Sequence, residues 1–418
     1  MTSTKAEADA VEPSDAVAQA TICKAGSAPA RDIMGNRALL AGCFAAVAIL
    51  AGATFLTPRL LPALSGAFRI ETARAGWFFT SYFFGYSTSV LVGGALSDIL
   101  GRRGPFLGGV VLIGASLLVI GFSPGYYSVL TGMLLLGIGA GLVEGLVSAL
   151  MADLTENRGL LMNLAQVSFN LGALVVPFFA AYCETSRIGW RGSYFIVGLL
   201  ALALAAFLAG QIFPPFTRVN RLGLREFSEF MGNPTFWVLS FSMAAYVGAE
   251  QGLASWLSYL LSSGFAAQDT LVSLSLSVFW GAMIPGRLAC GWLTLKVDPR
   301  RLVFFSFAGS FVMFAGLYLV SDPVNMVILA GMIGLVMAGT WPTILATAAD
   351  YFPGQAGAAL GVIIASGSFG GMVFPWLIGV AAEHLGLGPA ISITGGILSI
   401  AGCTGFGYLI RRKPESSL

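Results

Sequence analysis

Charged residues, histidine and closely spaced cysteines are scarce in this sequence. Of its 418 residues only 10% are charged and 56% are hydrophobic, whereas about a quarter of the residues of a water-soluble domain are charged. There is one histidine, His384, and the five cysteines lie far apart, so neither a zinc or haem site nor a disulfide framework is expected. The sequence has no phosphate-binding loop and no nucleophile paired with a histidine. We therefore expect no cofactor, no metal and no enzymatic activity.

Most of the hydrophobic residues are gathered in twelve long runs. A helix needs about 20 apolar residues to cross the hydrocarbon core of a bilayer, so the sequence predicts an all-α protein with twelve transmembrane helices. The small net charge of +2 and the scattered Lys and Arg residues provide no basic face for nucleic acid. The expected spans are 38–63, 72–97, 104–123, 126–151, 159–183, 191–213, 235–262, 270–295, 301–320, 324–349, 355–382 and 388–410.

The polar segments between these runs divide the chain into five regions. Residues 1–36 are rich in Ala, Ser and acidic residues, a composition typical of a disordered tail, and residues 412–418 form a second tail. The longest internal polar break, 214–234, predicts a linker that lies on the membrane surface. It joins two six-helix bundles, 37–213 and 235–411.

The Lys and Arg residues predict the orientation in the membrane. Loops rich in these residues stay on the cytoplasmic side, and placing both termini there puts sixteen of the twenty-two on that side. No N-glycosylation sequon is present, which favours a bacterial inner membrane over other plasma membranes, and we expect a monomer. The sixteen are Lys5, Lys24, Arg31, Arg37, Arg102, Arg103, Arg158, Arg218, Arg221, Arg225, Lys296, Arg300, Arg301, Arg411, Arg412 and Lys413.

The two predicted bundles repeat each other in sequence. The segment GGALSDILGRR near residue 100 matches GWLTLKVDPRR near residue 297, and MAD matches AAD at the same offset. Two repeats of six helices in the same sense are expected to enclose a site at the middle of the membrane. The equivalent pairs are Gly94 and Gly291, Asp153 and Asp350, each 197 residues apart, and Pro177 and Pro375, 198 residues apart.

This organisation resembles that of the major facilitator superfamily, and one loop resembles the signature loop of that family. The resemblance implies a cytoplasmic gate in which Asp98 and the arginines of the loop meet an acidic residue at the foot of the fourth helix, Asp153 here. Ile99 stands where family members usually have Arg. The alternative is that Arg102 and Arg103 serve only the orientation in the membrane. The loop residues are Gly94, Asp98, Gly101, Arg102 and Arg103.

Four segments resemble a narrower group, the fucose, galactose and glucose proton symporters. The resemblance implies proton-coupled sugar uptake with Glu144 as the coupling residue. It also makes Tyr246 and Gln251 candidate substrate-binding residues. Two positions depart from the fucose pattern, since Pro58 replaces a membrane Asp and Phe169 aligns with an Asn. The segments are 143–150, 162–173, 245–261 and 339–344, which match the family's fourth, fifth, seventh and tenth helices.

Two glutamates, Glu144 and Glu250, lie well inside predicted spans. An acidic side chain in the hydrocarbon region costs about 2.5–3.5 kcal/mol by insertion scales, so a functional role is the default interpretation. A carboxyl group that is alternately neutral and charged suits proton coupling, which we assign to Glu144, because its protonation changes the cost of closing a cavity around it. Glu250 is assigned to the substrate hydroxyls. The alternative for both is a buried packing charge paired with Arg59 or Arg287.

Amides and tryptophans supply the other substrate-binding candidates. Asn163, Gln166 and Asn170 share one helix face, and amides both donate to and accept from sugar hydroxyls, although helix-to-helix bonding is the alternative. Thr340 begins a weaker polar stripe with Thr343 and Thr347. The flat rings of Trp256 and Trp341 suit the apolar face of a pyranose, whereas Trp280 and Trp376 are interpreted as packing or membrane-interface residues. Arg287 is assigned to the gate or to structure, since it can extend toward the cytoplasmic end.

These observations predict a secondary transporter that moves a hexose-like sugar and protons through alternating access. An exporter of drugs or amphipathic metabolites, driven by proton antiport on the same fold, is the alternative. A receptor or a structural membrane protein is disfavoured by the two glutamates within spans.

Overall fold

The computed structural model describes residues 37–154, 158–214, 231–352 and 356–411. The predicted tails, 1–36 and 412–418, and most of the predicted linker lie outside the described residues. The first helices are α2 (Arg37–Phe68), α3 (Thr72–Leu100), α4 (Arg103–Gly121), α5 (Tyr126–Leu154), α6 (Arg158–Thr185) and α7 (Gly189–Ala209). They are followed by α9 (Pro234–Tyr259) with the short π-helical η2 (Leu260–Gly264), α10 (Asp269–Leu293), α11 (Pro299–Leu319), α12 (Pro323–Met337), α13 (Thr340–Tyr351), α14 (Ala356–Leu385) and α15 (Leu387–Arg411).

Every predicted span falls on one of these helices or on two consecutive ones. The span predicted at 324–349 falls on α12 and α13, which are separated at Ala338 and Gly339. Ten helical stretches among the described residues are long and apolar enough to cross a membrane. The helices α3 and α9 are not among the ten, although they contain 29 and 26 residues. The number of twelve transmembrane helices therefore stays a prediction.

Asn or Asp followed by Pro starts three helices of the second half. Asn233, Asp298 and Asp322 each accept a hydrogen bond from a backbone N–H two residues further on, at the start of α9, α11 and α12. The proline that follows each cap needs no hydrogen-bond partner at the first helical position. At α11 the Arg300 side chain also donates to Asp298 and thereby lowers the pKa of this carboxyl below its ordinary value, so that the cap is ionised at neutral pH.

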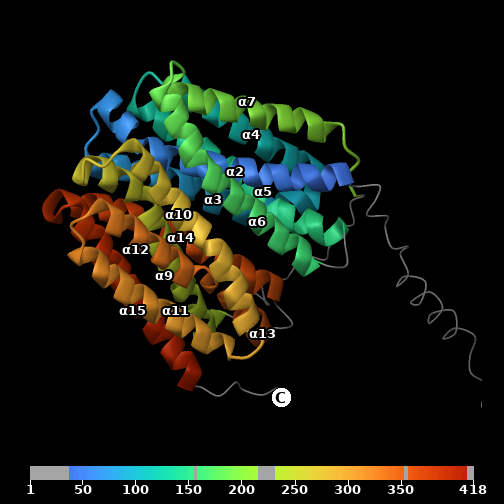
Figure 1. Ribbon diagram of the computed structural model, residues 1–418. Coiled ribbons are helices and arrows are strands. Elements are labelled where there is room, and N and C mark those ends of the chain that lie inside the picture. Colours follow the sequence, from blue (N-terminus) through green and yellow to red (C-terminus); the bar gives the residue numbers. More distant parts are fainter. Residues whose placement is uncertain (1–36, 155–157, 215–230, 353–355, 412–418) are drawn as a thin grey trace, which may run out of the picture.

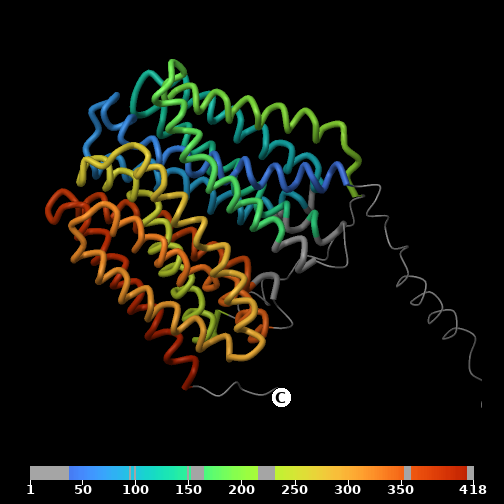
Figure 2. Tube along the Cα trace, viewed as in Figure 1, coloured from blue at the N-terminus to red at the C-terminus, as the bar shows by residue number. Residues whose placement is uncertain are grey.

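The helices form two groups that lie side by side. Figure 1 shows α2 to α7, in blue to green, on one side, and α9 to α15, in yellow to red, on the other. Figure 2 follows the chain through the same two groups. They meet where α3 packs against α14, α6 against α10 and α2 against α9. The interface between the groups is thus made by helices that occupy equivalent places in the two predicted repeats. The residues at which each predicted bundle begins and ends stay predictions.

Close helix contacts recur in both groups at the offset found in the sequence. A side chain at Gly137 in α5 would collide with the backbone carbonyl of Tyr82 in α3, and one at Gly334 in α12 would collide with that of Phe279 in α10. Both members of the second pair lie 197 residues after those of the first. Backbones can approach this closely only at glycine. A second equivalent pair of contacts joins Gly172 to Ala48 and Gly370 to Ala244.

Candidate functional site

A cavity lies between the two helix groups and consists of two adjoining compartments. The outer one has a volume of about 450 Å³ and reaches Thr294 and Pro299, where α10 ends and α11 begins. The inner one has a volume of about 90 Å³ and is lined largely by aromatic residues. We call the end of the bundle near Pro299 the cavity end and the other the closed end. Both compartments are lined by Leu50, Glu144, Gln166, Phe169, Arg287 and Trp341.

Arg287 of α10 is the central charge of this cavity. Its Nη1 donates to the side-chain oxygens of Gln166, at 3.1 Å, and Asn170, at 3.5 Å, both on α6. Its positive charge acts on the carboxyl groups of both Glu144 and Glu250. Arg287 is the only cation among the residues that line either compartment. One guanidinium therefore serves two carboxyl groups from different halves of the chain.

The Glu250 carboxyl is buried beside two hydrogen-bond donors of its own helix. It accepts from the hydroxyl of Tyr246, one turn earlier in α9, and from Nε2 of Gln251 at 3.4 Å. Only 6% of Glu250 is exposed. Because these donors hold the carboxyl at the wall of the inner compartment, it can exchange hydrogen bonds with a molecule bound there.

The Glu144 carboxyl lies on the opposite side of the cavity, on α5. It interacts with the hydroxyl of Tyr86 on α3 and with the charge of Arg287. Tyr82, one turn before Tyr86, shares a hydrogen bond of 2.9 Å with Thr54 of α2. Since Glu144 lines both compartments, its carboxyl is positioned to exchange a proton with the space that reaches the cavity end.

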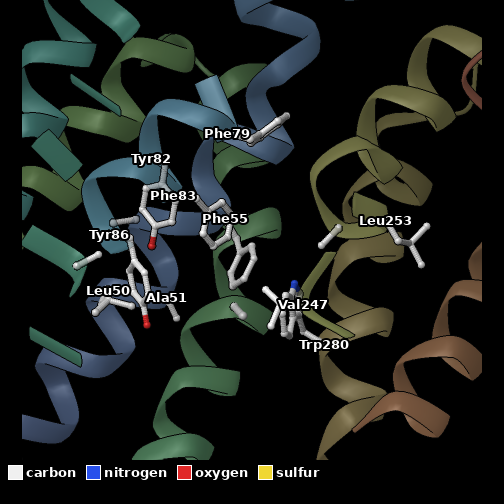
Figure 3. Packing of buried hydrophobic residues seen from close by; sticks show 14 of the residues in the cluster. Leu50, Ala51, Phe55, Phe79, Tyr82, Phe83, Tyr86, Val247, Leu253 and Trp280 are labelled. Carbon is white, nitrogen blue, oxygen red and sulfur yellow. The ribbon is translucent and has the colours of Figure 1, made fainter. Parts of the chain in front are cut away.

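Aromatic rings form the wall between the cavity and the closed end. The ring of Trp280 packs on that of Phe55 with centroids 4.4 Å apart, and Phe169 meets it edge-on at 6.0 Å. Figure 3 shows Phe55 and Tyr86 on the side of the first helix group and Trp280 across from them. Such rings exclude water while offering flat apolar faces to a ligand.

Contacts between the two groups close the other end of the bundle. The Arg59 side chain of α2, only 2% exposed, forms an ion pair of 3.1 Å with Glu184 of α6, within the first group. Its Nε donates to the Ser273 hydroxyl of α10 at 3.0 Å. The backbone N–H of Ala73 in α3 donates to the Glu383 carboxyl in α14 at 3.3 Å. Arg59 therefore pairs with Glu184 rather than with either glutamate of the cavity.

We expect Ser273→Ala to increase the population of molecules that open at the closed end. A hydrogen bond from a charged donor contributes about 1.5–3 kcal/mol, so its loss shifts the conformational equilibrium by about tenfold or more. Spin labels on the exposed positions Glu71 and His384, in a cysteine-free background, would report a longer distance. Ser275→Ala is the control, because its hydroxyl bonds Val272 of its own helix. Identical distance distributions for the two variants would contradict the role of Ser273.

The structure brings together most of the predicted site residues, though not all. Glu144, Glu250, Gln166, Tyr246, Gln251, Trp341 and Arg287 line the cavity, and Asn170 contacts Arg287. Thr340 is buried and is not among the lining residues. Trp256 is also buried, with its indole N–H donating to the Pro375 carbonyl at 2.8 Å. Arg287, assigned above to the gate or to structure, lines the inner compartment together with both glutamates.

The predicted gate at the cavity end is described only in part. The side chains of Asp98 and Asp153, like that of Asn163, lie outside the described residues. Arg103 donates to the Ala209 carbonyl at 2.7 Å, within the first helix group, and Arg102 is half-buried. The gate therefore stays a prediction.

Several lining residues were not predicted from the sequence. Tyr86, Phe55 and Trp280 look like ordinary apolar helix residues in the sequence, and only their neighbours on other helices reveal their place. One signal was available for Trp280, since it lies seven residues before Arg287 and therefore on the same helix face. Within the part of the chain that the structure describes, no three His, Cys, Asp or Glu residues are grouped as metal ligands would be.

This chain is similar to known transporter proteins in sequence and in fold. The model of a family described as the Major Facilitator Superfamily matches residues 42–335. The chain is 26% identical over 270 residues to the glucose/mannose transporter GlcP of Bacillus subtilis (strain 168), a match that covers 61% of this chain and 65% of that relative. It is 24% identical over 371 residues to the gentisate transporter of Corynebacterium glutamicum, with 81% of each chain covered.

Solved structures share the arrangement of helices. The D-xylose-proton symporter superposes with a TM-score of 0.73 over 88% of this chain and 97% of that chain. A bacterial homologue of the human lysosomal transporter Spinster, in an inward-facing and unoccupied conformation, superposes with a TM-score of 0.70 over 92% and 95%. Sequence identity is 14% in both comparisons, so these likenesses show the fold alone.

Proposed function

The chain belongs to the major facilitator superfamily, and on that premise we propose that it takes up a hexose-like sugar together with protons by alternating access. It is an integral membrane transporter of small molecules and not an enzyme. The observation that carries the proposal is that Glu144, Glu250 and Arg287 line the inner compartment of a cavity that reaches one end of the bundle. Ionised together, the three groups have a net charge of −1. Binding of one proton makes them neutral.

Charge balance gives a physical reason for coupling. Moving a net charge away from water is costly, whereas a neutral group of side chains is more easily enclosed when the cavity closes. A proton on Glu144 therefore favours the closure that carries substrate across, and its release after opening resets the site. Coupling in this scheme requires only that protonation bias two arrangements of the same two helix groups.

The polar lining supports a sugar as the substrate. Gln166 and Gln251 each carry a donor and an acceptor, and Glu250 accepts, so that the inner compartment matches the mixed donor and acceptor rim of a sugar. Trp341, which faces Tyr246 with centroids 6.5 Å apart, offers an aromatic face for the apolar side of the ring. One of the relatives in sequence is a glucose/mannose transporter.

The proposal includes an orientation in a bacterial inner membrane, with the protein as a monomer. Arg37, Arg103, Arg301 and Arg411 lie at the ends of helices near the cavity end, and the cytoplasmic side retains cationic loops. The cavity then opens to the cytoplasm. Asp98, Arg102, Arg103 and Asp153 would close that end in the opposite state.

Export of amphipathic compounds by proton antiport is the second candidate. It is favoured by the outer compartment, whose wall includes the apolar residues Val47, Val147, Met151 and Leu345. A wall of this kind suits an apolar ligand better than a sugar.

Uptake into proteoliposomes distinguishes the two candidates. A panel of labelled hexoses, together with gentisate and 4-hydroxybenzoate, is offered with and without an inward proton gradient. We expect one or more hexoses to accumulate only with the gradient, and the outside medium to become more alkaline during uptake. Failure of every hexose, combined with proton-driven removal of apolar dyes from the vesicles, would contradict sugar uptake and favour export.

A further inference from the structure

One face of α10 follows the interface with the first helix group from the closed end to the cavity. Ser273, Trp280 and Arg287 are spaced by seven residues and so share this face. Ser273 accepts from Arg59 of α2, the Trp280 ring packs on Phe55 of α2, and Arg287 donates to Gln166 of α6. Trp280 thus lies between the closed end and the charged centre of the cavity.

Two nitrogen donors on this face have no hydrogen-bond partner in the part of the chain that the structure describes. They are Nε1 of Trp280 and Nε of Arg287, both buried, and both residues line the inner compartment. Buried donors without partners are rare because they have lost their hydrogen bonds to water. Two of them at the wall of one compartment indicate that a molecule in the compartment supplies the acceptors.

The ring of Trp280 is enclosed by other aromatic rings, and its N–H has no partner among the described residues. The ring packs against Phe55 and is met edge-on by Phe169, at 6.0 Å, and by Phe279, at 5.1 Å. The residue is 1% exposed. Stacking of a sugar on this ring would compete with phenyl rings already in place, whereas the indole N–H lacks a partner.

We propose that Trp280 is a substrate-binding residue whose indole N–H donates a hydrogen bond to an acceptor oxygen of the substrate, with Nε of Arg287 as a second donor. The inference rests on the proposed function in taking that substrate to be a sugar. Recognition is then divided between the two sides of the site. Donors on α10 select oxygen atoms that accept, and the Glu250 carboxyl on α9 selects hydroxyl groups that donate.

Replacement of the indole by a phenyl ring, which is aromatic but has no N–H, tests this role. In Trp280→Phe, binding of the hexose that binds wild type most tightly, beginning with D-glucose, should weaken about fivefold, the effect of one neutral hydrogen bond. Binding is measured by calorimetry on the purified full chain. Trp237→Phe is the matched control, because its indole N–H donates to the Met231 carbonyl at 2.9 Å, away from the cavity. The control should bind as wild type does.

Singly deoxygenated analogues of the same hexose separate a hydrogen bond from packing. One analogue, which lacks the oxygen that accepts from Trp280, should bind equally well to wild type and to Trp280→Phe. An equal loss for every analogue, or affinity for the parent hexose within twofold of wild type, would overturn the proposal. If Trp280→Phe does not fold, 3-benzothienylalanine at position 280 keeps the ring volume and removes only the N–H.

The outcome also distinguishes this inference from the proposed function. If 4-hydroxybenzoate binds and no hexose does, sugar uptake is contradicted while Trp280 is still tested, because a carboxylate oxygen is also an acceptor. The same fivefold loss for that ligand would support the role of the indole N–H. Unchanged binding of that ligand would overturn it.

Discussion

Glu144→Gln is expected to abolish accumulation of the substrate against a gradient while leaving exchange of substrate across the membrane intact. The amide keeps the size and hydrogen-bonding capacity of the side chain but cannot take up or release a proton. One proton moving through 100 mV supplies about 2.3 kcal/mol, which sustains a gradient of about fiftyfold. The variant should equilibrate at a ratio of about one, measured as labelled hexose in proteoliposomes with an imposed potential.

The control for this experiment is Glu71→Gln, the same change at an exposed position at the start of α3. It should accumulate the hexose as wild type does. Counterflow, in which unlabelled hexose inside the vesicles exchanges for labelled hexose outside, shows whether the Glu144 variant still binds and moves substrate. Normal accumulation by Glu144→Gln would contradict the assignment of the coupling proton to this residue.

Arg287→Met is expected to reduce hexose uptake by about a hundredfold and to destabilise the protein. It removes the only cation among the described lining residues and takes away the positive charge that acts on the carboxyl groups of Glu144 and Glu250. Removing one partner from a buried charged group costs about 3–5 kcal/mol, and the lower figure is expected because Arg287 also lines the outer compartment, which reaches the cavity end. Uptake by proteoliposomes and the melting temperature in detergent measure the two effects.

A second substitution tests whether charge balance is the cause. In the double variant Glu250→Gln and Arg287→Met, one negative charge is removed along with the positive one, so the melting temperature should recover toward that of Glu250→Gln alone. Arg301→Met, an exposed arginine at the start of α11, controls for loss of a cation and should melt as wild type does. A double variant less stable than Arg287→Met would refute the charge-balance explanation.

The helices could be predicted from the sequence because lipid requires apolar spans. The family could be predicted because one loop and an internal repeat are characteristic of it. A span must be apolar over its whole length, so the run predicted at 126–151 nearly coincides with α5 (Tyr126–Leu154). Membership of the superfamily, predicted from the loop around Asp98 and from the repeat, is confirmed. The separation of α12 from α13 at Gly339 was missed, since hydropathy gives no sign of a local break in an apolar run.

The site could be predicted only where a residue is unusual for its surroundings. Glu144 and Glu250 stand out because charge is rare inside a span, and the structure puts both at the cavity wall. Arg287 was equally visible, but its place in the same compartment depends on how α5, α9 and α10 pack, which no single helix encodes. Trp256 shows the converse, since this tryptophan near the end of α9 donates to a carbonyl of α14 and is not among the residues that line the cavity. The roles of these residues stay predictions until transport is measured.

The glycine contacts described above make each half of the protein rigid. At Gly137 and again at Gly334, two helix backbones touch with no layer of side chains between them, and joints of this kind cannot yield by small side-chain adjustments. Each half of the protein therefore acts as a stiff lever. We expect a displacement that a ligand causes at Arg287 to reach Ser273, at the closed end of the same half, where α10 contacts Arg59 of the other half.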